Sequence, residues 1–246
     1  MDQLLVALDV DTAESARALA DRLRGAVGGV KIGSRLFTSH GPGIVEELVA
    51  RGDRVFLDLK FHDIPNTVAG AVAAATRLGV WMVNVHASGG RAMMLAAREA
   101  ADREAARVGR RAPLVIAVTM LTSLDQGALA DIGIAAPLGS QVERLAQLAR
   151  DCGLDGVVAS PREIGLIRRQ CGGSFAIVTP GIRGGAAATR SGGASAADDQ
   201  SRTESAAGAL AAGANYIVVG RPIIASADPR EAAERIAAEC RAIPSP

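Results

Sequence analysis

One stretch of the chain carries acids and a base at a spacing suited to proton-transfer chemistry. Asp58 and Lys60 follow the apolar run 55–57 with one residue between them, and Asp63 comes three residues later. Side chains alternate between the two faces of a β-strand, so Asp58 and Lys60 are predicted to point to the same side. The spacing therefore predicts a carboxylate and an ammonium group side by side at the end of a strand.

The scarcity of lysine makes this stretch unusual. The chain has 27 basic residues (Lys and Arg), of which only Lys31 and Lys60 are lysine. Arg stays protonated at any working pH, whereas Lys can release a proton. Both lysines also fall at the ends of predicted strands. We interpret them as functional; the alternative is that two surface lysines fall there by chance.

The composition excludes several classes of function. The chain has 246 residues, 49% hydrophobic and 22% charged, which is typical of a soluble globular protein. Aromatic residues make up 2% and the net charge is +1, so neither a base-stacking platform nor an electrostatic site for nucleic acid is expected. No apolar run is long enough to span a bilayer, and residues 1–3 lack the basic region of a signal peptide.

The cysteines and histidines have no pattern typical of a metal site. Cys152, Cys171 and Cys240 form no C-x-x-C pair, and they are expected to be reduced structural thiols of a cytoplasmic protein. The three histidines, at positions 40, 62 and 86, are isolated and lack zinc spacing. The sequence therefore predicts no metal ligand set.

The elements that must position Asp58 and Lys60 alternate regularly along the chain. Apolar, β-branched runs predict eight strands, at 3–9, 29–32, 54–59, 81–86, 113–119, 156–159, 175–179 and 216–219. Amphipathic stretches predict helices at 13–25, 37–51, 66–78, 90–108, 124–132, 140–151, 161–170, 203–212 and 228–241. Apolar strands that alternate with helices are typical of a parallel sheet covered on both sides.

Eight strand–helix units in this length predict an α/β fold of the TIM (β/α)8 barrel type. A doubly wound open sheet is the alternative, but it usually has fewer strands. No break in composition marks a domain boundary, so residues 1–246 are predicted to form one barrel domain. The Gly-, Ala- and Ser-rich segment 181–199 is expected to be a mobile loop on the phosphate side of the site.

Polar residues gather where the predicted strands end, which is where such barrels place their active sites. They are Asp9, Lys31, Asp58, Lys60, His86, residues 119–123, Ser160, residues 180–183 and residues 220–221. Arg183 and Arg221 follow the last two strands, where TIM barrels often bind phosphate. Gly220 would let a backbone N–H approach an anion closely.

The pattern D-x-K-x-x-D-I-P-N-T, at 58–67, resembles the centre of the orotidine 5′-phosphate decarboxylase family. The resemblance extends over essentially the whole chain, through A-L-D at 7–9, V-K-I-G at 30–33, T-M-L-T-S at 119–123, T-P-G-I-R at 179–183, D-Q at 199–200 and V-G-R-P at 219–222. Related barrels such as hexulose-phosphate synthases share the D-x-K-x-x-D core, but I-P-N-T and T-P-G-I-R favour the decarboxylases. The chain departs from the family at Ser34 and Arg35, where relatives often carry an apolar residue and an acid.

The resemblance implies a charged tetrad and a substrate. Lys31, Asp58, Lys60 and Asp63 would form the tetrad, with Lys60 donating a proton to the pyrimidine C6 of orotidine 5′-phosphate, and no cofactor or metal is implied. Asp63 would come from the neighbouring subunit of a homodimer. The implied substrate-binding residues are Asp9 and Thr67 at the ribose, Thr122 at the pyrimidine edge, Gln200 between pyrimidine and phosphate, and Arg183, Gly220 and Arg221 at the phosphate end. Pro180 is implied as a further substrate-binding residue.

Two other functions stay open at this point. A metal-dependent sugar-phosphate aldolase or decarboxylase on the same barrel could use the acids to hold Mg²⁺, although Lys60 between them would compete with the metal. A barrel that binds a phosphate ligand without catalysis is the other. A Schiff-base aldolase is disfavoured, because it needs a neutral lysine and flanking carboxylates favour the charged one.

Overall fold

Apolar residues alternate between the two faces of each strand and so divide the core into two parts. Leu5 and Ala7 pack inside the barrel with side chains from the other strands, among them Phe56 and Met82. Leu4, Val6 and Leu8, on the opposite face, belong to the larger cluster that contacts the helices. The strands are therefore apolar on both faces, as the sequence pattern predicts.

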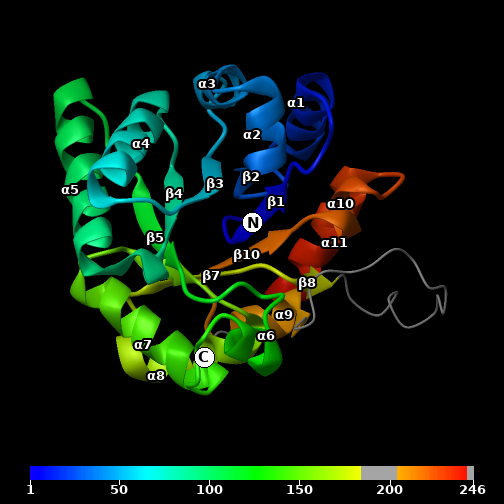
Figure 1. The fold of residues 1–246 in the computed structure, drawn as a ribbon. Helices are drawn as coiled ribbons and strands as arrows, with labels where there is room; N and C mark the ends of the chain where they lie inside the picture. The colour runs from blue at the N-terminus through cyan, green and yellow to red at the C-terminus, as the bar shows by residue number, and fades with distance from the viewer. Residues whose placement is uncertain (184–203, 243–246) are drawn as a thin grey trace.

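The computed structural model describes residues 1–183 and 204–242, and it closes eight parallel strands into a barrel (Figure 1). Around the barrel the order is β1, β10, β7, β6, β5, β4, β3, β2, and back to β1. The strands are β1 (Leu4–Ala7), β2 (Gly29–Gly33), β3 (Val55–Phe61), β4 (Met82–His86), β5 (Leu114–Val118), β6 (Gly156–Val158), β7 (Ala176–Thr179) and β10 (Tyr216–Val219). A separate parallel pair is formed by β8 (Ile182–Arg183) and β9 (Glu204–Ser205). The predicted TIM barrel in a single domain is confirmed.

Helices surround the strands (Figure 1). They are α1 (Ala13–Leu23), α2 (Ser34–His40), α3 (Gly43–Ala50), α4 (Pro65–Leu78), α5 (Gly90–Val108), α6 (Gln126–Asp131), α7 (Leu138–Asp151), α8 (Ile164–Cys171), α9 (Ala206–Ala211), α10 (Arg221–Ile224) and α11 (Pro229–Arg241). Two 3-10 turns, Ala87–Gly89 and Pro161–Glu163, precede α5 and α8. In the part of the chain described, none of these helices has the length and apolar character needed to cross a membrane.

The prediction of one helix over 37–51 is wrong, because α2 and α3 are separate. Gly41 ends α2 with φ of 67°, a left-handed value that favours glycine. Pro42 follows as the N-cap of α3, and proline cannot continue a helix since it lacks the N–H and its ring clashes with the preceding turn. The Gly-Pro pair therefore sets this boundary.

Other elements also differ from the prediction, and three of these differences lie near the predicted site residues. Strand β3 runs on through Lys60 to Phe61, so Lys60 belongs to the strand and not to the loop after it. The helix predicted at 203–212 begins only at Ala206, because Ser205 caps it by accepting a hydrogen bond from the backbone N–H of Gly208. The short helix α10 was not predicted; it starts directly after Gly220.

Candidate active site

Three of the predicted catalytic side chains lie together at the carboxyl ends of β2 and β3. The ammonium group of Lys60 donates a 2.7 Å hydrogen bond to Asp58 Oδ1. The Nζ of Lys31, from β2, lies 3.2 Å from Asp58 Oδ2. Each carboxylate oxygen of Asp58 is thus paired with one ammonium group, and the predicted side-by-side placement of Asp58 and Lys60 is confirmed.

Asp58 is ionised in this setting. Its burial alone would raise the pKa of the carboxyl, but the charges of Lys31 and Lys60 and the hydrogen bonds from Lys60 and Asn84 outweigh burial and lower the pKa overall. The side chains of Asp58 and Lys31 are only 11% and 12% exposed, whereas that of Lys60 is 37% exposed. Lys60 is therefore the cation of this group that a ligand can most readily reach.

The backbone at Lys60 is left-handed, with φ of 52°, and no other non-glycine residue in the described ranges has a positive φ. Such a conformation costs an L-residue with a side chain about 1–2 kcal/mol. The backbone N–H of Lys60 donates a 2.8 Å hydrogen bond to Oδ1 of Asn84, a fully buried residue of β4. Asn84 also donates from Nδ2 to Asp58 Oδ1 at 2.7 Å.

Asn84 is a site residue that sequence reasoning missed. The signal was an amide at the centre of the otherwise apolar run of β4, since a buried amide needs hydrogen-bond partners.

Asp9 and two glycines complete the side of the site next to Lys31. Asp9 follows β1, and its Oδ1 lies 3.5 Å from Lys31 Nζ. A Cβ at Gly33 would lie 3.2 Å from that Nζ, so a glycine here leaves room for the ammonium group. A Cβ at Gly220 would lie 3.8 Å from Asp9 Oδ2, which places the start of α10 beside Asp9. The structure thus brings the predicted residues Asp9, Lys31 and Gly220 together.

Asp63 is not part of this group within its own chain. It is exposed, and its Oδ1 accepts a 2.6 Å hydrogen bond from the backbone N–H of Ile64. Among the described residues it forms no ion pair with Lys60. The neighbouring Ile64 side chain is 66% exposed, which is unusual for a large apolar residue.

Two histidines flank the group on the β4 side. His86 ends β4, and its ring centroid lies 5.3 Å from that of His62. The pKa of His86 is lowered, mainly because burial disfavours its charged form and further because His62 and Lys60 are close; Asp58 acts in the opposite direction. His86 is therefore a neutral neighbour of Lys60 near pH 7.

The other predicted substrate-binding residues are placed less completely. Thr67 is exposed in the first turn of α4, and Thr122 and Pro180 are half-buried in the loops after β5 and β7. Arg221 is exposed at the first position of α10, and the backbone of Arg183 lies in β8, opposite Ser205 of β9. Gln200 and most of the predicted loop 181–199 lie outside the described residues.

The described residues contain no group of three or more His, Cys, Asp or Glu side chains placed to hold a metal ion. The three cysteines are free and buried, and burial raises the pKa of each thiol. These thiols are therefore poor nucleophiles, as predicted for packing residues.

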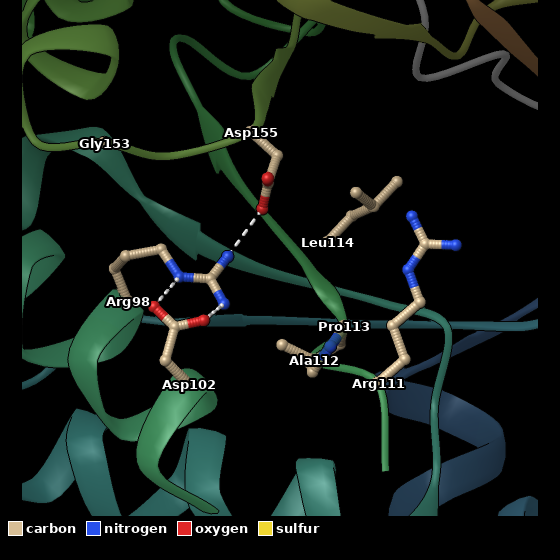
Figure 2. Close-up of a pocket in the computed structure, with 8 residues that line it drawn as sticks. All are labelled: Arg98, Asp102, Arg111, Ala112, Pro113, Leu114, Gly153 and Asp155. Carbon is tan, nitrogen blue, oxygen red and sulfur yellow. Dashed lines mark hydrogen bonds and ion pairs between the residues drawn. The ribbon is translucent and has the colours of Figure 1, made fainter. Parts of the chain in front are cut away.

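A second charged cluster lies at the amino-terminal ends of β5 and β6, at the end of the parallel barrel opposite to Lys60. Figure 2 shows its side chains. The cluster lines a pocket of about 360 Å³ near the start of β5 and β6. Arg98 of α5 donates to both oxygens of Asp102, at 3.0 and 2.6 Å, and to Asp155 at 2.7 Å. Asp155 also accepts a 2.7 Å bond from the backbone N–H of Val115. Because its carboxylates are paired with Arg98 and a backbone N–H, this cluster holds α5 to the start of β5 and to the segment before β6. It offers no proton for transfer, since arginine stays protonated.

The arrangement at the carboxyl end can stabilise and protonate an anion. An ammonium group hydrogen-bonded to a buried carboxylate is a charged donor held in place, and a second ammonium group balances that carboxylate. A negative charge that develops near Lys60 would meet a fixed cation without solvent reorganisation.

Residues 2–236 match the family model described as "Orotidine 5'-phosphate decarboxylase / HUMPS family". A relative from Moorella thermoacetica named orotidine 5′-phosphate decarboxylase is 53% identical over 239 residues, which cover 97% of this chain and 92% of the relative. One of the same name from Syntrophotalea carbinolica is 52% identical over 240 residues, or 98% of this chain and 95% of that one. The crystal structure of orotidine 5′-phosphate decarboxylase from Lactobacillus acidophilus is similar with a TM-score of 0.84 and 35% identity, covering 98% of this chain and 100% of that chain.

Proposed function

The chain belongs to the orotidine 5′-phosphate decarboxylase / HUMPS family, and we propose that it works without a cofactor, through a C6 carbanion that Lys60 stabilises and protonates. The relatives make it a carboxy-lyase that converts orotidine 5′-phosphate to UMP and CO2 in pyrimidine biosynthesis. The observation that carries the mechanistic proposal is the contact of Lys60 with Asp58, and of Asp58 with Lys31, at the carboxyl ends of β2 and β3.

The reaction breaks the bond between C6 and the carboxylate carbon. The bonding electron pair stays on C6, in the plane of the ring, where the π system cannot delocalise it well. The Lys60 ammonium lies beside C6, stabilises the developing charge and then transfers one proton to the carbon. Lys60 is left as a neutral amine and regains its proton from water before the next turnover.

The neighbouring charges keep Lys60 ready for this step. Asp58 holds the Lys60 ammonium group in place, because opposite charges at hydrogen-bond distance attract each other. Lys31 balances the second oxygen of Asp58 and thereby holds the carboxylate ionised when the anionic substrate binds. Such fixed charges contribute most where water is excluded.

The rest of the substrate is assigned to the loops on the same face of the barrel. Asp9 and Thr67 bind the ribose hydroxyls, and Thr122 binds the pyrimidine edge. Arg183, Gly220 and Arg221 bind the phosphate, and Pro180 contributes to the same substrate site. Gln200, which lies outside the described residues, is assigned to the bridge between phosphate and pyrimidine. Support comes from the barrel, which brings Gly220 next to Asp9, and from the position of Arg221 directly after β10.

We also propose a homodimer in which Asp63 acts in the site of the neighbouring subunit. The carboxylate of Asp63 is exposed, and Ile64 beside it is an uncovered apolar side chain. An apolar groove of about 560 Å³ opens along the same strand, lined by Leu59 and Phe61 among others. An exposed acid next to apolar surface fits an interface better than a solvated loop.

The free thiols support a cytoplasmic setting.

The test of the function is release of CO2 from orotidine 5′-phosphate by the purified protein. The fall in ultraviolet absorbance on conversion to UMP follows the reaction continuously. Turnover in metal-free buffer supports the proposal. No turnover, or turnover only after Mg²⁺ is added, contradicts it.

A further inference from the structure

The bulge in β3 directs the backbone N–H of Lys60 to a side chain of β4, the amide of Asn84. Leu57 pairs with Val83 and Phe61 pairs with Val85, so four steps along β3 correspond to two along β4. Residue 84 alone lies between those two β4 positions. The N–H of Lys60, turned by its left-handed φ, therefore points at the side chain of Asn84 and not at a ladder carbonyl.

The orientation of the Asn84 amide is fixed by its two partners. A backbone N–H can only donate, so the atom that faces Lys60 N at 2.8 Å is the oxygen. The other end is then the NH2 group, which faces Asp58 Oδ1 at 2.7 Å, and an ionised carboxylate only accepts. Asn84 is fully buried, so no water competes for these bonds.

We propose that Asn84 is a positioning residue for the decarboxylation: one amide ties the Asp58 carboxylate to the Lys60 backbone and so fixes where the Lys60 ammonium lies. The inference rests on the proposed function. Asp58 Oδ1 accepts from both the Lys60 ammonium and the Asn84 amide, so the carboxylate cannot rotate without breaking both bonds. Asn84 contacts no reacting atom; it acts through the two residues on either side of it.

The first test replaces Asn84 by an apolar residue of similar size. Asn84→Leu is expected to lower kcat for orotidine 5′-phosphate about 10–100-fold while KM changes less than about threefold, because the lost interaction serves transition-state geometry. Thr76→Val is the matched control: Thr76 is also buried and bonds the carbonyl of Val72 from α4, away from the site. The control is expected to keep both constants within about twofold of wild type.

The second test separates the two bonds of the amide. Asn84→Asp keeps the acceptor for Lys60 N but sets a carboxyl group against Asp58. Two adjacent carboxyls share a proton, so one pKa is raised. Below that pKa the protonated carboxyl can donate to Asp58, and above it the two charges repel. The ratio of variant to wild-type kcat is therefore expected to fall as pH rises, which a merely structural residue would not produce.

Dividing the kcat of the variant by that of the wild type at each pH cancels the pH effects of other ionisable groups near Asn84. These groups are Lys31 of β2, Asp58 and Lys60 of β3, His62 after β3, and His86 of β4. If Asn84→Leu does not fold, by circular dichroism and melting, Asn84→Asp decides alone. A pH-independent ratio for Asn84→Asp, or a kcat within twofold of wild type for folded Asn84→Leu, overturns the inference. If the wild-type protein shows no turnover, the proposed function itself is overturned. If the wild type turns over and the Asn84 variants behave as it does, only this inference fails.

Discussion

The two ends of the barrel each carry a cluster of charges, and the clusters differ in the kind of cation. At the amino end, the side chain of Arg98 is 15% exposed and its fork is divided between Asp102 and Asp155. At the carboxyl end, the Lys60 side chain is 37% exposed, and its ammonium makes one hydrogen bond to a described residue, with Asp58. An ammonium group has three donors, so two of them are not used by the described residues.

The difference teaches how to tell a structural cluster from a reactive one. Both clusters hold acids paired with a basic side chain, so the presence of charge alone does not distinguish them. Arginine keeps its proton and locks its partners, whereas lysine can transfer one. The strained backbone also occurs only at the carboxyl end, within the described residues. A pocket such as that in Figure 2 is therefore a weak guide to function when its acids are already paired with an arginine.

Exchanging the cation at each end tests this comparison most severely. Lys60→Arg keeps the charge but cannot donate a proton, and Lys60→Ala removes both. We expect each variant to lower kcat about 10³-fold or more. Lys60→Arg loses proton donation alone, and Lys60→Ala loses both the fixed charge and proton donation. The matched exchange Arg98→Lys should leave kcat within about twofold, because it lies far from the chemistry. Near-normal turnover of folded Lys60→Ala would remove Lys60 as the proton donor.

Mixing two inactive variants tests whether Asp63 acts in the site of a neighbouring subunit, as proposed for the carboxyl end. Lys60→Ala and Asp63→Ala dimers are each expected to be nearly inactive. After subunit exchange, a mixed dimer has one site with both residues intact, so an equal mixture should recover about a quarter of the wild-type sites. Activity is measured after exchange has been verified with differently tagged chains. No recovery would place Asp63 outside the neighbouring site.

Removing the clamp at the amino end should affect stability alone. Arg98→Met keeps the apolar stem but leaves Asp102 and Asp155 without their shared partner. Because these acids are partly exposed, the expected loss is about 1–2 kcal/mol in the free energy of unfolding. Urea denaturation measures it, and kcat is read in parallel. A large drop in kcat would mean that the two ends are coupled, contrary to the comparison.

The smallest effect is expected from chelation. If lysine replaces a metal as the cation at the carboxyl end, EDTA should leave turnover unchanged, and added Mg²⁺ should have no effect. Loss of activity that Mg²⁺ restores would favour the metal-dependent alternative on the same barrel.

The sequence predicted the barrel and the contact of Asp58 with Lys60, because both follow from regular periods of apolar residues and from strand alternation. It did not predict the left-handed backbone at Lys60, since no local signal marks a lysine for that conformation. Asn84 was overlooked although an amide inside an apolar strand requires partners. The Gly41-Pro42 pair is a local signal for a helix break, whereas the apolar spacing over 37–51 predicts one continuous helix. The proposed contact of Asp63 with a neighbouring site would need a second subunit, and a single chain does not specify one.

The two lysines have a practical consequence for labelling this protein. Apart from an α-amino group, the side chains of Lys31 and Lys60 are the only primary amines in the sequence, and both pair with Asp58 at the carboxyl ends of β2 and β3. Apart from the α-amino group, an acylating reagent that modifies amines at random in most proteins can react here only with these two lysines of the proposed catalytic centre. The more exposed Lys60 is expected to react faster than Lys31. Protection by bound nucleotide would report occupancy directly in the mass of the intact chain.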